Sequence, residues 1–359
     1  MRAGPELGDS SIADGVNCPV PFSRYDRVQL GHGSGGKMSA ALLKERFLPH
    51  FSNPALAKLT DAAIVEVAAG RLAVSTDTFV VRPLEFPGGN IGSLAVHGTL
   101  NDIAMMGARP RYMSAGFVLE EGLELEVLDR IIAAMARAAE EAGVPIVAGD
   151  TKVVERGKAD GVFINTTGIG ELDPGFAPAP DLARAGDAVI VSGPIGRHGI
   201  AVMAVREGLE FEVEIESDAA TLSPLVELLR EQVGNAVHVL RDPTRGGVAS
   251  ALNEIAESAG VGVELVEDAM PIPGPVRAVC EILGFDPLYV ANEGILIAMV
   301  EGGSEQDAVA ALRAHPLGEE ATVVGRVVEA HPGLVAMRTG IGGTRVVDML
   351  PGEQLPRIC

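Results

Sequence analysis

The sequence of 359 residues contains no tryptophan, and aromatic residues make up only 4% of it. Its 47% hydrophobic content is therefore mostly Ala, Val, Ile and Leu, the composition of β-branched strands layered with Ala- and Leu-rich helices. No apolar run approaches the roughly 18 residues of a membrane-spanning helix. The first residues also lack the basic segment and apolar run of a secretory signal. The composition predicts an α/β (α+β) protein without a membrane span.

Cysteine, histidine and basic residues are also few. The three cysteines, Cys18, Cys280 and Cys359, are far apart and form no CxxC pair, which favours a reducing cytoplasm. The seven histidines show neither HxH nor HExxH spacing, which argues against a zinc site. With 28 Lys and Arg against 49 Asp and Glu, the net charge is −21, and such a surface repels nucleic acid and anionic membranes. A phosphate ligand would then need backbone amides, a few lysines and a bridging cation.

The length predicts two domains. A proline-rich stretch without apolar periodicity separates two series of alternating strand and helix patterns. We divide the chain into a loose leader (1–27), a first α/β domain (28–172), a linker (173–186), a second α/β domain (187–339) and a flexible tail (340–359) that ends in a cysteine. Within the second domain, residues 288–290 read as a strand.

Cysteine is the last residue of the chain, where a structural role is unusual. Burying Cys359 would also bury the charged terminal carboxylate, which is costly without a partner. The turn-rich approach to it predicts a mobile arm. Two interpretations remain at this point: an incidental thiol, or a thiol that is loaded at one site and carried to another.

A glycine-rich loop, Gly31–Lys37, precedes an expected helix at 39–50. Its residues Gly33, Ser34, Gly35, Gly36 and Lys37 are candidates to hold phosphate through converging backbone amides and one lysine. The spacing is neither that of a Walker loop nor GxGxxG, so a flexible hinge is the alternative.

Acidic side chains stand next to Gly, Thr or Asn at predicted strand ends and on one helix. These are Asp77, Asp102, Asp150 and Asp242. Ligands of α/β sheets bind at strand ends, and carboxylates beside a triphosphate commonly hold Mg²⁺. Lys152 is placed to touch a phosphate, and Glu293 interrupts an apolar region. Each is as consistent with a structural role as with a functional one, but together they predict an ATP–Mg²⁺ site.

Together these motifs resemble the hydrogenase maturation proteins of the HypE family, in the aminoimidazole ribonucleotide synthetase-like superfamily. The resemblance runs from about Leu30 to Cys359. Its motifs are GHGSGGK, STDTFVVRPLEFPGGNIGSLAVHGTLNDIAMMGA, GDTKVVERG, GVFINTTGIG, RDPTRGGVASALNEIA, DPLYVANEG and the terminal PRIC.

The resemblance implies the two-domain fold of that superfamily and a cytoplasmic homodimer that packs through its first domains. It also implies ATP-dependent dehydration of a carbamoyl group on Cys359 to a thiocyanate, whose cyanide serves the iron of [NiFe]-hydrogenase. The implied partners are the carbamoyltransferase HypF and the HypC–HypD complex. Asp77, Asp102 and Asp242 would bind Mg²⁺, the glycine-rich loop would cover the ATP phosphates with Asp150 and Lys152 nearby, and Lys152 and Glu293 would act with Cys359 in catalysis.

Two rivals remain. Selenophosphate synthetase shares the superfamily, but it requires cysteine or selenocysteine in the glycine-rich loop, and positions 31–37 contain neither. A non-catalytic maturation scaffold would use Cys359 only to hold iron. Turnover of ATP that depends on a carbamoylated tail distinguishes a catalyst from a scaffold.

Overall fold

The computed structural model describes residues 25–29, 42–51, 53, 70–208, 215–349 and 357–359. The glycine-rich loop, Cys18 and an expected strand at 63–67 lie outside the described residues. In the described part of the chain, no helix is both long and apolar enough to cross a membrane.

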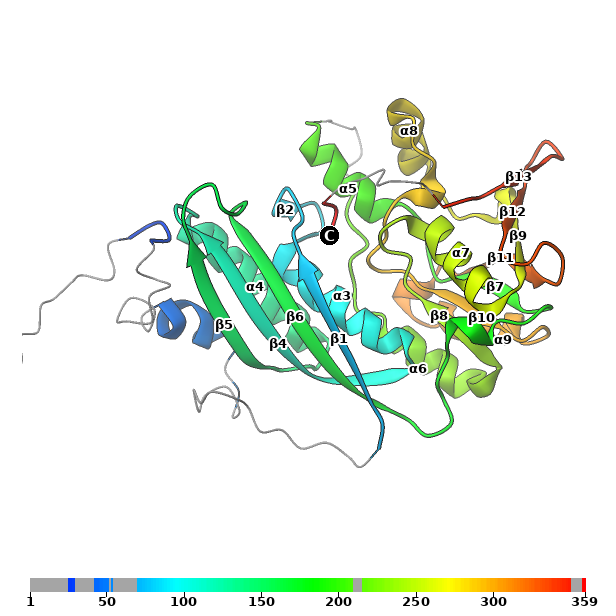
Figure 1. Cartoon of the computed structure of the whole chain (residues 1–359), viewed down its shortest axis with the longest axis horizontal. Helices are drawn as coiled ribbons and strands as arrows, with labels where there is room; N and C mark the ends of the chain where they lie inside the picture. Colours follow the sequence, from blue (N-terminus) through cyan, green and yellow to red (C-terminus); the bar gives the residue numbers. More distant parts are fainter. Residues whose placement is uncertain (1–24, 30–41, 52, 54–69, 209–214, 350–356) are drawn as a thin grey trace, which may run out of the picture.

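Among its described residues, the first domain has a four-stranded sheet with helices packed against one face (Figure 1). The strand order is β1-β6-β4-β5, in which only the β4–β5 pair is parallel. The large elements are β1 (Leu72–Phe79), α3 (Ile91–Met105), β4 (Ala108–Glu120), α4 (Leu125–Glu141), β5 (Ile146–Val154) and β6 (Val162–Leu172). The short ones are a π-helix (Leu43–Phe47), α2 (Leu48–Phe51), β2 (Glu85–Phe86) and β3 (Gly89–Asn90).

Helix α3 is buried almost all round, as expected of a helix that is apolar on every side. It contacts strands β1, β4 and β6, helix α4, and helix α6 of the second domain. Asn90 caps its first turn, because the Asn90 side chain accepts from the N–H groups of Gly92 and Ser93. Helix α3 therefore lies between the two domains, and its polar residues can serve both.

The second domain is a seven-stranded sheet in the order β13-β12-β9-β11-β7-β10-β8. Its strands are β7 (Ala188–Val191), β8 (Val237–Arg241), β9 (Gly262–Val266), β10 (Ile297–Val300), β11 (Thr322–Val328), β12 (Val335–Arg338) and β13 (Thr344–Val346). Its helices are α5 (Arg197–Arg206), α6 (Ser223–Gln232), α7 (Gly247–Ala259), α8 (Gly274–Leu283) and α9 (Glu305–Arg313), with 3-10 turns at Pro180–Leu182, Gly234–Ala236, Glu267–Ala269, Pro287–Tyr289 and Pro316–Gly318.

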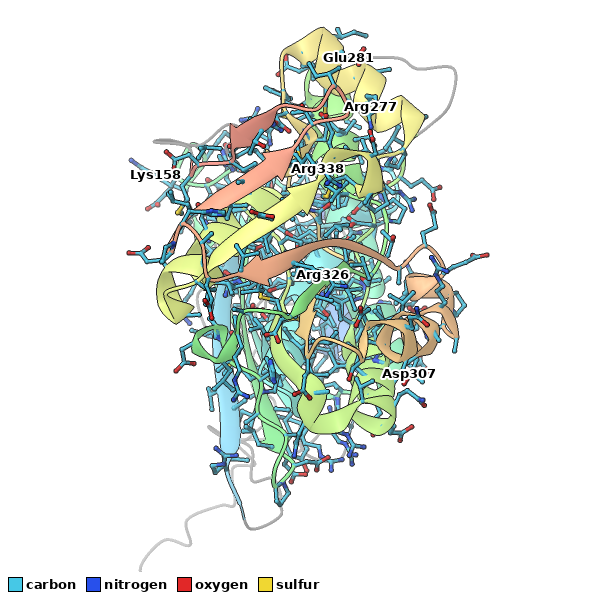
Figure 2. All side chains as sticks on the ribbon, turned by 90° about the vertical axis from the view of Figure 1, so that its right-hand side faces the viewer. Lys158, Arg277, Glu281, Asp307, Arg326 and Arg338 are labelled. Atoms are coloured by element: carbon cyan, nitrogen blue, oxygen red, sulfur yellow. The ribbon has the colours of Figure 1, made fainter. Side chains whose placement is uncertain are left out.

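Strands β7 and β10 are buried on both faces, which explains their uninterrupted apolar sequences. Side chains of α7 pack with one face of this sheet, and those of α6 and α9 pack with the other. Strands β9, β11 and β12 have an outward face instead, where Arg326 and Arg338 are exposed (Figure 2).

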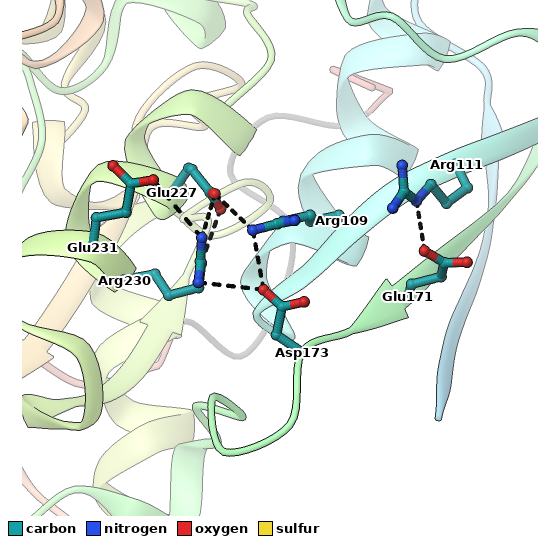
Figure 3. A network of polar contacts seen from close by, with 7 residues as sticks. All are labelled: Arg109, Arg111, Glu171, Asp173, Glu227, Arg230 and Glu231. Atoms are coloured by element: carbon teal, nitrogen blue, oxygen red, sulfur yellow. Dashed lines mark hydrogen bonds and ion pairs between the residues drawn. The ribbon is translucent and has the colours of Figure 1, made fainter. Parts of the chain in front are cut away.

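A polar network joins the domains at the start of β4 (Figure 3). Arg109 of β4 lies 2.8 Å from a Glu227 oxygen on α6 and 3.1 Å from Asp173 in the linker. Arg230 of α6 pairs with the same two carboxylates. Pairs this exposed contribute ~0.2–1 kcal/mol each, so the network orients the domains more than it stabilises them.

The structure corrects three expectations from the sequence. Residues 288–290 are not a strand, because Pro287 and the capping carboxylate of Asp286 start a 3-10 turn there. Asp150 and Lys152 do not follow a strand but lie within β5. Strand β13 falls inside the stretch predicted as tail, and Val347 after it is fully buried.

Candidate active site

Asn101 of α3 connects the two domains at the predicted site. Its Nδ2 donates to the carbonyl oxygen of Ala220 at 3.0 Å, and its Oδ1 accepts from the N–H of Leu222 at 2.8 Å. Nδ2 also lies 3.3 Å from the carbonyl oxygen of Glu293. This side chain is fully buried. Asn101 therefore holds two segments of the second domain against α3, including the backbone of Glu293.

Glu293 is 2% exposed, and its backbone N–H donates to Oδ1 of Asp218 at 3.2 Å. A Cβ atom added at Gly98 of α3 would lie 2.9 Å from the Phe79 ring and 3.8 Å from Oε2 of Glu293. The glycine therefore lets α3 approach the end of β1 closely, and it brings the Glu293 carboxylate next to both elements.

Asp102 faces β1 from the same helix. The hydroxyl of Ser75 donates to its Oδ2 at 2.6 Å. Because alternate residues of a strand share a face, Asp77 lies on the same face of β1 as Ser75, towards α3. The structure thus brings Asp77 and Asp102 together, as the sequence predicts, at the side of the sheet that the helices cover.

Five carboxylates face this region: Asp77, Asp102, Asp218, Asp242 and Glu293, here called the carboxylate cluster. Burial raises the pKa of Asp242 to about 7, and the charges of Asp102 and Asp77 add to the increase. Burial raises the pKa of Glu293 well above its ordinary value, with further increases from the other four members. Burial likewise raises the pKa of Asp218 to about 6. Because the other four carboxylates each raise the pKa of Glu293, all of them lie close enough to repel it.

Two buried oxygen atoms of the cluster have no hydrogen-bond partner in the described part of the chain: Oδ2 of Asp218 and Oε1 of Glu293. Such atoms are costly, and in active sites they commonly await a ligand. Oε1 of Glu293 is therefore a free acceptor for an N–H group that enters the site.

The chemistry of the cluster fits Mg²⁺, which prefers carboxylate oxygens. Within the described residues no group of three or more such side chains forms a ready-made metal cage. Mg²⁺ in nucleotide sites is usually held by one or two carboxylates together with phosphates. The arrangement suits a cation that binds with a nucleotide.

The last three residues are docked between the domains, against residues that directly follow β1. The N–H groups of Val80 and Arg82 donate to the carbonyl oxygens of Cys359 and Arg357, both at 3.3 Å. Ile358 is 1% exposed and belongs to a buried apolar cluster to which both domains contribute. The expectation that the whole tail lies outside the core is therefore wrong for these residues. The carboxyl terminus lies at the centre of the molecule in Figure 1.

Lys152 and Asp150 lie elsewhere on this chain. They are exposed, and Nζ of Lys152 donates to both Asp150 oxygens at 2.7 and 2.8 Å. Lys152 pairs with Val118 of β4, which places it on the helix-free face of the sheet. Its strand β5 is at the opposite edge from β1. The structure therefore does not bring Lys152 and the carboxylate cluster of the same chain together.

Four residues near the site were not predicted from the sequence: Ser75, Asp218, His198 and Arg206. His198 and Arg206 hold the docked tail, with hydrogen bonds to the carbonyl oxygens of Ile358 and Arg357. No local pattern in the sequence selects His198 or Arg206, because the tail residues that they contact are more than 100 positions away.

We expect Asn101→Ala to destabilise the protein by ~1–3 kcal/mol, the usual cost of leaving buried polar groups without partners. The variant leaves the N–H of Leu222 and the carbonyl of Ala220 unpaired between the domains. Chemical denaturation measures the change, and Asn165→Ala, on the exposed face of β6, is the control. Equal stability of the Asn101 variant and the unaltered protein would contradict the connecting role of Asn101.

Comparison with known proteins places this geometry in a family. Residues 59–172 match the N-terminal domain of AIR synthase related proteins, and residues 184–336 match the C-terminal domain. The chain is 53% identical over 336 residues to the carbamoyl dehydratase HypE of Azotobacter vinelandii, covering 94% of this chain and 98% of that protein. The chain belongs to the HypE family.

HypE crystal structures have the same architecture. One, a hydrogenase maturation protein HypE in complex with ATP, superposes with a TM-score of 0.89 at 51% identity, covering 92% of this chain and 99% of that one. Another, from a HypE–HypF complex, has a TM-score of 0.76 at 45% identity, covering 86% and 100%. The two-domain fold and the family expected from the sequence are confirmed. The relatives do not favour selenophosphate synthetase.

Proposed function

We propose that this HypE family protein dehydrates a carbamoyl group on Cys359 to a thiocyanate, at the expense of ATP, during hydrogenase maturation. One observation carries the proposal. The terminal cysteine docks beside the end of β1, the strand that bears Asp77, and the Glu293 carboxylate, whose Oε1 is buried without a partner among the described residues, lies beside Gly98 of α3, next to Phe79 of that strand.

The chemistry of the reaction explains why water must be excluded from the site. The oxygen of the S-carbamoyl group attacks the γ-phosphorus of ATP, and the bond to ADP breaks. The C–O bond then breaks to release phosphate and the C≡N bond forms, while the nitrogen loses both protons, one to a base in the site and one to the departing phosphate. Water would reverse or divert this step, so exclusion of water protects the intermediate.

The chain's own groups fit particular parts of this reaction. The free Oε1 of Glu293 is suited to accept a proton from the carbamoyl nitrogen. Docking of Ile358 in the core fixes the backbone that carries the cysteine. The glycine-rich loop lies outside the described residues, and its phosphate contacts remain part of the proposal. Mg²⁺, held by Asp77, Asp102 and Asp242, would offset the charge of the transferring phosphoryl group.

We expect Asp102→Asn to weaken Mg²⁺-dependent ATP binding by about tenfold or more, since hydrogen bonds and ion contacts to a charged group contribute ~1.5–3 kcal/mol. Calorimetric titration of ATP at several Mg²⁺ concentrations measures it. Asp307→Asn, on the outer face of α9, is the control (Figure 2). A normal Mg²⁺ dependence in Asp102→Asn would remove this residue from the cation site.

The proposed partners follow the reaction. HypF supplies the carbamoyl group, and the HypC–HypD complex receives the cyanide, all in the cytoplasm. A protein of the same family has been crystallised with HypF, which supports the first partner. The second rests on the family resemblance.

We also propose a homodimer through the first domains. In the described residues, β1 and β5 are the two edge strands of the sheet, and no further strand pairs with their outer edges. Leu72 and Val74 of β1 are also exposed. Open strand edges readily pair with another chain. Because Lys152 lies on the edge strand opposite β1, a second copy's β5 beside β1 would place its Lys152 next to the strand against whose end this chain's Cys359 docks.

We expect Lys152→Ala to lower the rate of dehydration by about 10²-fold, the usual loss when one charge-stabilising donor is removed, while carbamoylation by HypF stays normal. Lys158→Ala is the matched control. Mixing Lys152→Ala with Cys359→Ser subunits should restore dehydration if the lysine acts across the dimer. Recovery only with unaltered subunits would mean that each lysine serves its own chain.

Intact mass spectrometry tests the function as a whole. Incubation with the carbamoyl donor system should add one carbamoyl group, and ATP with Mg²⁺ should then remove one water. A non-catalytic scaffold would show neither the ATP-dependent water loss nor ATP turnover that depends on the loaded tail. That result would reject the proposed function.

A further inference from the structure

The docked tail is held by helix α5 of the second domain. At the start of this helix, Nε2 of His198 lies 2.9 Å from the carbonyl oxygen of Ile358. At its end, an Arg206 nitrogen donates to the carbonyl oxygen of Arg357 at 2.7 Å. Both hydrogen bonds are made to backbone carbonyl oxygens of the tail. They are therefore available whether or not the cysteine carries a group.

The surroundings of His198 determine which ring nitrogen carries the proton. The Ile358 carbonyl oxygen can only accept, so Nε2 of His198 carries the hydrogen that points at it. Nδ1 is then an acceptor and takes the hydrogen of the Ser217 hydroxyl, 2.8 Å away, whose oxygen accepts from the backbone N–H of Ala219 at 3.1 Å. Ser217 thus supports the tautomer that donates to the tail.

Among the residues that the structure describes, this donor has no other partner. The His198 side chain is fully buried, and the Phe86 ring packs edge-on against it with centroids 5.4 Å apart. Burial lowers the pKa of His198 to about 4, so the ring is neutral near pH 7. When the tail leaves, Nε2–H loses its acceptor in an apolar setting, which costs free energy. The inner position of the tail is favoured by that amount.

We infer that His198 is a positioning residue that favours the docked state of the tail by donating a hydrogen bond to the Ile358 carbonyl oxygen. Loading by a second protein requires the undocked state, and dehydration requires the docked one. This inference rests on the proposed function in that respect. His198 should therefore affect the two steps in opposite directions, which a residue needed only for folding would not do.

The test follows docking and chemistry separately. Trypsin can cut after Arg357 only when its side chain leaves Asp160 and the Val80 carbonyl, so loss of the last two residues reports undocking. We expect His198→Leu to increase this cleavage by about tenfold. In single turnovers of the preloaded protein it should slow dehydration similarly, while loading by HypF is unchanged or faster.

Three further variants make the result decisive. His198→Gln, which keeps a donor, should bring both rates to within about twofold of normal. His238→Gln alters another buried histidine, which contacts Asp187 and not the tail, and it should leave cleavage after Arg357 unchanged in folded protein. Should His198→Leu fail to fold, Ser217→Ala, which frees the ring to change its tautomer, should still increase cleavage.

Unchanged cleavage in His198→Leu, or in Ser217→Ala where the first does not fold, overturns the inference. Equal slowing of loading and dehydration overturns it as well, because it indicates a structural defect. If the unaltered protein shows no dehydration at all, the proposed function fails, and the cleavage assay still decides the role of His198.

Discussion

Cys359→Ser is expected to abolish both the carbamoyl and the cyano adducts, because serine offers no thiolate to accept the group. Folding should be preserved, since the change leaves Ile358 in the core and Arg357 on its partners. Mass spectrometry after incubation with the donor system and ATP measures the adducts, and the denaturation midpoint checks the fold.

Cys280 provides the matched control for this substitution. It is 1% exposed, and burial raises the pKa of its thiol to about 11, so it is a poor nucleophile. The Cys280→Ser variant should still form both adducts on Cys359 at normal yield. An adduct found on Cys280 or Cys18 of the Cys359 variant would refute the assignment of the terminal thiol.

Glu293→Gln is expected to lower the dehydration rate by about 10²–10⁴-fold, the usual contribution of a general base. Glutamine keeps the shape and the backbone contacts to Asn101 and Asp218 but cannot take up a proton. Carbamoylation should be normal, because that reaction belongs to the active site of HypF. Quenched-flow single turnovers with preloaded protein separate the two steps.

The same substitution should stabilise the Mg²⁺-free protein at neutral pH. The pKa of Glu293 is raised in the folded state, so its ionisation costs stability as the pH rises from the unfolded value towards the folded one. A neutral amide removes that cost. Glu264→Gln, on the exposed face of β9, should change neither property. A less stable Glu293→Gln protein with normal turnover would place Glu293 outside the site.

Much of the fold follows from local patterns. The sequence patterns predict helices at 91–106 and from 125 to near 143 and a strand at 162–170, and α3, α4 and β6 lie within a few residues of these bounds. Amphipathic or continuous apolar runs that end at glycine or proline specify such elements locally. Residues 288–290 were predicted wrongly because three apolar residues suit a strand as well as a turn. The short strand β13 was missed because its residues are mostly polar and exposed.

The candidate site was only partly predictable. Asp77, Asp102, Asp242 and Glu293 were selected by their neighbours in the sequence, and the structure brings them to one region. Lys152 was selected on the same grounds but lies on the other face of the sheet, because the pleat and strand order place it there. The spacing of residues in the sequence does not reveal the pleat or the strand order.

By itself, the sequence determined the family, the two α/β domains and the residue types available for chemistry, since these depend on local composition and on motifs within short segments. The tertiary structure alone decided that Ile358 is buried, that Asn101 links the two domains, and that His198 faces the tail. These contacts join residues more than 100 positions apart. They form because burying apolar surface forces the intervening polar groups to find partners, and a linear pattern carries no record of which partners those will be.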